Sequence, residues 1–126
     1  AEAATRRPRV YFEEWPDPLL CGGGWVSELV TLAGGDDVFA DRAPSRKASG
    51  RQVTSEEVRE RAPQVMLASW CGKAFDPAVP PAREGWEAMP AIRDGRVHEI
   101  DSAIILQPGP GALTAGLDAL EAILRA

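Results

Sequence analysis

The apolar residues of this 126-residue chain fall into short blocks, and their spacing predicts alternating strands and helices. Residues 9–13 and 64–69 each contain a short continuous apolar run, which predicts buried strands of a parallel sheet. Residues 25–33 gather their apolar side chains on one helical face and are followed by a Gly-Gly pair, a typical helix terminus. The apolar face of this predicted helix consists of Trp25, Val26, Leu29, Val30, Leu32 and Ala33.

A shorter helix is predicted to begin at Thr54 and to end at Pro63. Thr54 is followed three residues later by Glu57, the spacing of a capping box in which each side chain bonds the other residue's backbone N–H. A last helix is predicted after the Pro-Gly-Pro sequence at 108–110, because four leucines line one face with Ile123 beside them. These leucines are Leu113, Leu117, Leu120 and Leu124.

The remaining segments predict shorter pieces. Residues 38–39 predict a short strand, 41–52 a polar loop, and 82–88 a helical turn. Two strands, at 91–92 and 97–100, are predicted to flank an Asp-Gly turn. This order of elements predicts an α/β fold, a Rossmann-like three-layer α/β/α unit with a mostly parallel central sheet and no internal division.

Charge and composition exclude several classes of function. Apolar residues make up 44% of the chain and the net charge is −5, with a pI near 4.9. An acidic chain of this kind argues against binding nucleic acid or an anionic membrane surface. The apolar runs are too short to cross a bilayer, so we expect no membrane-spanning segment. The first residues contain neither a starting Met nor the apolar core of a signal peptide, and we expect the chain to be part of something longer.

Candidate catalytic and metal-binding groups are few. The run Gly22-Gly23-Gly24 stands where a phosphate loop would lie, but Ser27 occupies the position that a dinucleotide fingerprint gives to glycine. Cys71 would need a base to act as a nucleophile, and the single histidine, His98, is predicted on a strand. We therefore expect no enzyme and no metal site. We expect Cys21 and Cys71 to be free thiols. The alternative is a disulfide between them, because both are predicted on loops at the same edge of the sheet.

Tryptophans stand on the loops that follow strands. Trp15 and Trp25 flank the loop after the first strand, Trp70 follows the next long strand, and Trp86 lies near another loop. Ligands of open α/β sheets bind at the carboxyl ends of the strands. Each tryptophan alone is an ordinary core residue, but their common placement favours an aromatic binding surface for a large or planar ligand.

Five segments in this order resemble one protein family. They are VYFEEWPDPLLCGGGWVSELVTLAGG, VTSEEVRERAPQVMLASWCG, GWEAMPAIRDGRVHEID, PGPG and the leucine-lined helix. Together they resemble the C-terminal lobe of class III periplasmic binding proteins of ABC transporters, which carry cobalamin and iron-siderophores, with the cobalamin branch most similar. Two positions depart from the family pattern: Gly111 follows Pro110 where the family often has arginine, and Gly24 stands where it often has histidine.

The resemblance implies a domain organisation and a set of partners. Residues 1–8 would end the helix that joins two lobes, and residues 9–126 would form the C-terminal lobe, with the N-terminal lobe absent. Cobalamin would be the transported ligand rather than a cofactor, and the protein would be periplasmic or anchored at the cell surface, delivering it to a membrane permease. An iron-siderophore or haem on the same fold is the first alternative, and a Rossmann-like enzyme domain the second.

The resemblance also implies site residues. The loop after the first strand would form one wall of the cleft between the lobes, with Glu13 or Glu14 as an acceptor and glycines allowing close approach. Glu56 would lie on the outer rim and dock onto arginines of the permease. The expected ligand-binding residues are Glu14, Trp15, Pro16, Gly23, Trp25, Trp70, Cys71 and Gly72.

Overall fold

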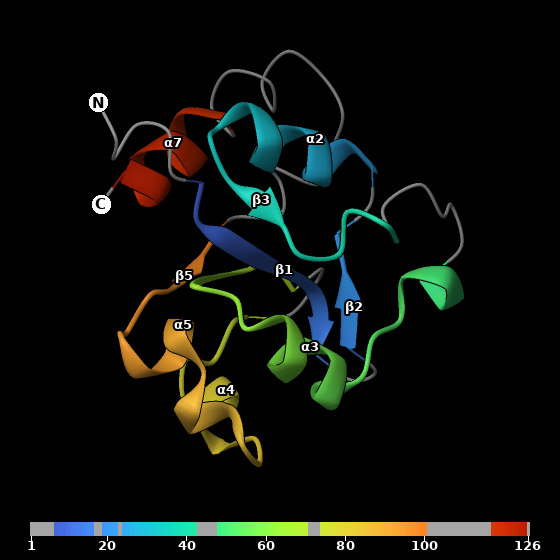
Figure 1. The fold of residues 1–126 in the computed structure, drawn as a ribbon, viewed down its shortest axis with the longest axis vertical. Helices are drawn as coiled ribbons and strands as arrows, with labels where there is room; N and C mark the ends of the chain where they lie inside the picture. The colour runs from blue at the N-terminus through green and yellow to red at the C-terminus, as the bar shows by residue number, and fades with distance from the viewer. Residues whose placement is uncertain are drawn as a thin grey trace.

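The computed structural model describes residues 7–16, 19–22, 24–42, 48–70, 74–100 and 117–125, which form helices on both faces of a central sheet (Figure 1). The strands are β1 (Arg9–Pro16), β2 (Leu19–Cys21), β3 (Asp36–Asp37), β4 (Val65–Ala68) and β5 (Val97–Glu99). The α-helices are α2 (Gly24–Leu32), α3 (Ser55–Arg61), α4 (Val79–Ala82), α5 (Pro90–Arg93) and α7 (Leu117–Arg125), and two 3-10 turns are η1 (Ala48–Arg51) and η2 (Trp86–Ala88).

The sheet is mostly parallel, as the sequence predicts. Its order is β2-β1-β4-β5, and β3 pairs in parallel with the beginning of β1. β1 runs parallel to β4 from Val10↔Val65 to Glu13↔Ala68, and β4 runs parallel to β5. Among the described strands only β2 is antiparallel to its neighbour, because it returns along β1 after a short connection. The ends of β1 and β4 therefore lie at the same edge of the sheet.

One face of the sheet is covered by α2 and α7 (Figure 1). Alternate residues of a strand point to opposite faces, and Val10 and Phe12 of β1 pack on this side together with Val65 and Leu67 of β4. α2 supplies Val26, Leu29, Val30 and Ala33 of its predicted apolar stripe, and Leu120 of α7 is fully buried against it. Leu32, expected in the same stripe, is exposed instead. This face is a continuous apolar core.

The opposite face carries the larger aromatic core. Tyr11, Met66 and Ala68 point to this side and pack with residues of the loops, of α3 and of the segment from α4 to α5. Trp86 is fully buried and meets Tyr11 edge to face, with ring centroids 6.1 Å apart. The two packed faces give the three-layer α/β/α arrangement that the sequence predicts.

The capping box at the start of α3 is confirmed. Thr54 Oγ1 accepts the N–H of Glu57 at 3.0 Å, and Glu57 Oε1 accepts the N–H of Thr54 at 3.0 Å. Glu57 also pairs with Arg42, and these two partners lower the pKa of its carboxyl. Glu57 is therefore held in place, whereas its neighbour Glu56 is exposed.

Several local predictions are wrong. The strand expected at 91–92 is helix α5, and the turn glycine Gly95 (φ 68°) lies just past the end of that helix, its N–H bonded to Ile92 O at 3.1 Å. The strand expected at 38–39 lies instead at Asp36–Asp37. The helical turn expected at 82–88 is divided between α4 and η2, η1 forms within the expected loop at 41–52, and β2 was not predicted. The last helix is present as Leu117–Arg125, and Leu113 lies outside the described residues. Of the segment 1–8 that was expected to end the linker helix, residues 1–6 also lie outside them.

Candidate functional site

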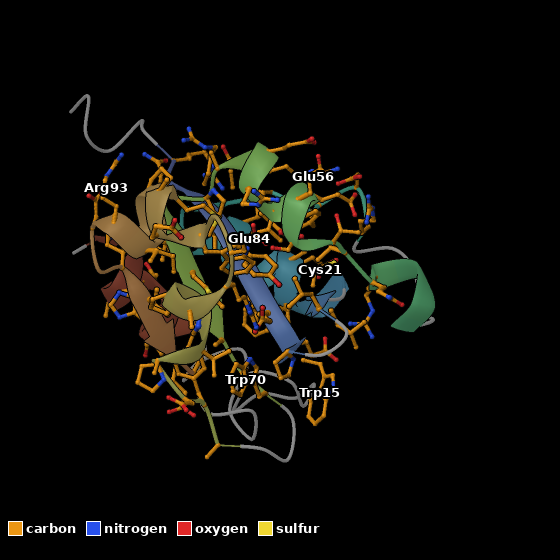
Figure 2. All side chains as sticks on the ribbon, turned by 90° about the horizontal axis from the view of Figure 1, so that it is seen from below. Trp15, Cys21, Glu56, Trp70, Glu84 and Arg93 are labelled. Carbon is orange, nitrogen blue, oxygen red and sulfur yellow. The ribbon has the colours of Figure 1, made fainter. Side chains whose placement is uncertain are left out.

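The carboxyl edge of the sheet is the candidate binding edge. We use this name for Glu14–Pro16 at the end of β1, Ser69 and Trp70 after β4, and the start of α2 at Gly24. The N–H of Ser69 donates to Glu13 O at 3.0 Å, the last backbone link between the two strands. Figure 2 shows Trp15 and Trp70 at this same end of the molecule. Two of the tryptophans grouped by the sequence analysis are therefore at one edge.

A β-bulge shapes the end of β1. Glu13 pairs with Cys21 and Trp15 with Leu20, so that Glu14 is one extra residue in β1 relative to β2. An extra residue bends a strand and changes the direction of the side chains that follow. Glu14, Trp15 and Pro16 are all half-buried as a result, and each retains surface at the carboxyl edge.

Glu14 is held by an arginine from a distant loop. Arg51 Nη1 donates to Glu14 Oε2 at 2.6 Å and to Cys21 O at 3.1 Å. Only 13% of the Arg51 side chain and 23% of the Glu14 side chain are exposed, so this pair is largely shielded from water. The pair cancels one positive charge at the carboxyl edge. The sequence did not identify Arg51 as a partner of Glu14, because no local signal reports a contact 37 positions away.

Glu13 lies beneath the edge as a fully buried carboxylate. It accepts hydrogen bonds from Tyr11 Oη at 2.9 Å, Trp70 Nε1 at 2.8 Å, and the guanidinium of Arg83 at 2.7 and 3.0 Å. A buried charge is tolerated when it is paired and hydrogen-bonded in this way. Burial, and next the charge of Glu13, raise the pKa of Tyr11 well above its ordinary value. Glu13 thus holds three side chains together inside the protein. The sequence did not identify Arg83 as one of its partners.

Trp70 is buried, with 3% of its surface exposed. Besides donating to Glu13, its ring meets Phe75 edge to face at 4.9 Å. Its indole therefore packs beneath the carboxyl edge and has little surface exposed to a ligand. Trp86 is fully buried in the aromatic core, which leaves Trp15 as the tryptophan with side-chain surface at the described part of the edge.

Most of the remaining expected site residues fall outside the part of the chain that the structure describes. Gly23, Cys71 and Gly72, and the side chain of Trp25, lie outside the described residues. Gly22 is described and is required for packing: a Cβ there would stand 2.9 Å from Val26 Cγ1 and 3.2 Å from Phe12 Cδ1. The beginning of the glycine run thus lets the chain pass closely over β1 and α2.

Groups suited to catalysis are scarce across the described ranges. Cys21 is a buried free thiol, and burial is the main cause that raises its pKa to about 12, so the thiol is protonated at neutral pH. Burial and the charge of Arg96 lower the pKa of His98. Across those ranges no cluster of three or more His, Cys, Asp or Glu residues could hold a metal ion. None of the helices described there combines the length and apolar character needed to cross a bilayer.

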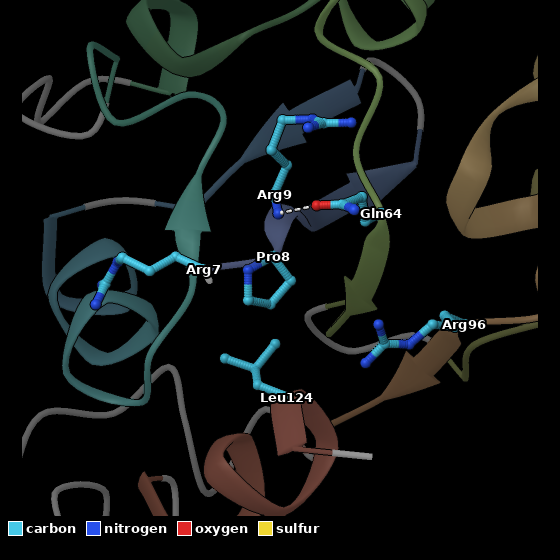
Figure 3. A pocket seen from close by; sticks show the side chains of 6 residues that line it. All are labelled: Arg7, Pro8, Arg9, Gln64, Arg96 and Leu124. Carbon is cyan, nitrogen blue, oxygen red and sulfur yellow. Dashed lines mark hydrogen bonds between the residues drawn. The ribbon is translucent and has the colours of Figure 1, made fainter. Parts of the chain in front are cut away.

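A hollow of about 370 Å³ opens at the opposite edge, where the strands begin (Figure 3). The guanidinium of Arg7 is bonded to Thr31 O and Gly35 O, both at 2.8 Å, and that of Arg9 to Ala62 O at 3.0 Å. Both guanidinium groups therefore bind backbone carbonyl oxygens, and they do not form an anion-binding site. The hollow is lined by Arg7, Pro8, Arg9, Gln64, Arg96 and Leu124.

Comparison with known proteins finds one family. The family model described as "Periplasmic binding protein" matches residues 1–104. A vitamin B12-binding protein of Vibrio parahaemolyticus serotype O3:K6 is 29% identical over 120 residues, which are 93% of this chain and 41% of the relative.

Two solved structures illustrate the range of relatives. The periplasmic heme-binding protein BhuT, in complex with two hemes, is 25% identical with a TM-score of 0.76 over 95% of this chain and 45% of its own. A protein of an ABC-type Fe3+-hydroxamate transport system from Saccharomonospora viridis DSM 43017 is 20% identical, with a TM-score of 0.74 over 99% of this chain and 44% of its own. The chain therefore spans less than half the length of each of these three relatives.

Proposed function

Because the chain belongs to the periplasmic binding protein family, we propose that it forms the C-terminal ligand-binding lobe of an ABC-importer solute-binding protein. Residues 1–8 would end the inter-lobe helix and residues 9–126 would form the lobe. The length relation supports this division, since the chain matches 41–45% of its longer relatives. The complete protein would bind its ligand between two lobes outside the cytoplasm and deliver it to a membrane permease.

Cobalamin is the ligand that the carboxyl edge fits best. The observation that carries this choice is charge pairing: Arg51 is matched by Glu14, and Arg83 by Glu13. The described part of the edge thus offers an aromatic surface at Trp15 and a neutral pair, rather than free arginines for an anionic ferric siderophore or for haem propionates. A broad corrin with neutral amide side chains suits such a surface. The 29%-identical vitamin B12-binding relative supports the same ligand.

A ligand panel tests this proposal. Titration of the full-length protein with cobalamin, a ferric hydroxamate and haem, followed by calorimetry, should show the tightest binding for cobalamin. A nucleotide titration in parallel covers the alternative of a Rossmann-like enzyme domain and should show no binding. Tighter binding of haem or of the siderophore would mean that this ligand, and not cobalamin, is the one transported.

The isolated 126-residue lobe should bind cobalamin weakly, because half of the contacts would be missing while the loss of translational freedom remains.

Replacing Trp15 with alanine in the full-length protein should weaken cobalamin binding by about 1–2 kcal/mol, roughly 5- to 30-fold. The reason is that Trp15 is half-buried at the carboxyl edge and supplies aromatic contact area there. The thermal midpoint should change little, since a fully buried tryptophan would instead cost about 3–5 kcal/mol of stability. Leu32→Ala is the matched control, because Leu32 is 64% exposed on α2. A large drop in the midpoint with unchanged affinity would make Trp15 a core residue.

Glu56 is the proposed contact with the permease. It occupies the first turn of α3, where the helix dipole favours a negative charge, and its side chain is exposed. Its neighbour Glu57 is engaged by Thr54 and Arg42 and has no comparable freedom. An exposed carboxylate on a rigid helix start can form a bidentate pair with an arginine of a partner.

Exchanging Glu56 and Glu57 for alanine separately should therefore give opposite results. Glu56→Ala should spare cobalamin affinity and weaken permease binding, most clearly at low salt, where surface charges are least screened. Glu57→Ala should lower the free energy of unfolding by about 0.5–2 kcal/mol, the range for loss of a cap. Glu60→Ala, an exposed carboxylate one turn further along α3, is the control for a nonspecific charge effect. Normal permease binding by Glu56→Ala would end the docking assignment.

A further inference from the structure

Three segments meet at the Glu13 carboxylate. Tyr11 lies two residues before Glu13 on β1, Trp70 follows the end of β4, and Arg83 lies between α4 and η2. Both carboxylate oxygens are used, because Arg83 Nη1 bonds Oε1 and Nη2 bonds Oε2. The bulged end of β1, next to Glu14 and Trp15, is therefore fixed from beneath by this one side chain.

Arg83 has a second partner on its other side. Its guanidinium carbon lies 4.5 Å from the centre of the Trp86 ring, within the range of a cation–π contact. Only 15% of the Arg83 side chain is exposed, so both contacts are made with little competition from water. A planar guanidinium can form a forked pair with a carboxylate and stack on an aromatic ring at the same time, which an ammonium group cannot do.

Trp86 in turn holds the first residue of α3. Its Nε1 donates to Ser55 Oγ at 2.5 Å, and Ser55 directly precedes Glu56. The turn before Trp86 also lies against α3, because a Cβ added to Gly85 would stand 2.6 Å from Arg59 Nη1. In the view of Figure 2, Glu84, the chain neighbour of Arg83, appears between Trp70 and Glu56.

We propose that Arg83 is a positioning residue that joins the two proposed functional surfaces. Through Glu13 it fixes Trp70 and the end of β1 at the ligand-binding edge, and through Trp86 it fixes the start of α3 at the permease-docking rim. This inference rests on the proposed function for the identity of the surfaces. The contacts of Arg83 are independent of it.

The consequence is that one conservative substitution should disturb two surfaces that face different partners. Arg83→Lys keeps the positive charge near Glu13 but loses the fork and the stacking. Loss of one charge-assisted hydrogen bond corresponds to roughly a tenfold change in an equilibrium constant. Lysine retains one hydrogen bond to the buried carboxylate, so the variant should still fold.

The experiment compares three variants of the full-length protein. Arg83→Lys should lower both cobalamin affinity and permease binding by roughly tenfold. Ser55→Ala removes only the acceptor of Trp86 Nε1, so it should lower permease binding and leave cobalamin affinity unchanged. Val30→Ala is the control matched for loss of stability, because Val30 is fully buried in the opposite core, and it should change neither binding at a temperature where all variants are folded.

Amide hydrogen exchange on the ligand-free protein gives a readout that does not depend on any ligand. In Arg83→Lys, exchange should rise at the ends of β1 and β4 and in the first turn of α3, and stay unchanged in α2. A uniform rise, or one confined to a single surface, would overturn the proposal, as would loss of only one of the two bindings. If the wild-type protein does not bind cobalamin, the proposed function fails, and the exchange pattern still decides whether Arg83 joins these segments.

Discussion

Replacing Trp86 with alanine should lower the free energy of unfolding by about 3–5 kcal/mol, the range for removing a large aromatic side chain from a core. Trp86 is fully buried and touches three groups that cannot all move into the space it would leave. The ring centroid of Tyr11 lies 6.1 Å from that of Trp86, and the guanidinium carbon of Arg83 lies 4.5 Å from the centre of the Trp86 ring. The third group is Ser55 Oγ, 2.5 Å from Trp86 Nε1. Urea unfolding would measure the loss as a lower midpoint at an unchanged slope.

Trp86→Phe separates the two parts of this effect. Phenylalanine retains most of the apolar contact with Tyr11 but cannot donate to Ser55, so its loss should be clearly smaller than that of alanine. Leu32→Ala, on the exposed surface of α2, should stay within about 0.5 kcal/mol of the wild type. A loss below about 1 kcal/mol for Trp86→Ala would mean that the aromatic core collapses around the gap or that Trp86 is not buried in solution.

The elements that the sequence predicts correctly depend on neighbouring residues. The strand at 9–13, the strand at 64–69 and the helix at 25–33 follow from hydrophobic spacing within one element, and all are present. The capping box follows from the spacing of Thr54 and Glu57 alone. Local patterns of this kind survive because tertiary contacts reinforce them.

The wrong predictions arise where one local signal serves two structures. Asp94-Gly95 is a strong hairpin signal, and glycine with positive φ is also the usual residue just past the end of a helix. Here Gly95 has a φ of 68° and follows α5, whose first residue is Pro90. Proline at that position favours a helix start, and this competing cue decides the outcome.

The side-chain partners at the carboxyl edge could not be predicted from the sequence. Glu13 and Arg83 are 70 positions apart, and Glu14 and Arg51 are 37 apart. Nothing in the spacing of acidic and basic residues identifies such pairs, because they depend on which loops fold back over which strand. For the same reason the tryptophan count did not separate Trp15, with surface at the edge, from the buried Trp70 and Trp86.

Stability should fall as the pH rises from about 9 towards about 12, with Cys21 as one identifiable cause. Burial and next the nearby Asp37 carboxylate raise the pKa of this thiol from 9.0 to about 12 in the folded protein. Below pH 9 both folded and unfolded chains keep the proton, so the thiol adds no pH dependence. Between the two values the unfolded chain loses the proton while the folded chain retains it, so rising pH favours unfolding. One such group contributes a slope of at most about 1.4 kcal/mol per pH unit.

Comparison with Cys21→Ala isolates this contribution. Tyr11, whose pKa is also raised mainly by burial, and Cys71 are present in both proteins, so most of their effect cancels when the two curves of unfolding free energy against pH are subtracted. What does not cancel is the contribution of Cys21 to the raised pKa of Tyr11, the smallest of its causes. The difference should be constant below about pH 9, because there the substitution removes only packing. Above that pH the wild type should lose stability faster than the variant, so that the two curves converge or cross. Parallel curves up to about pH 11 would show that the Cys21 thiol titrates normally and is not enclosed between β2 and its neighbours.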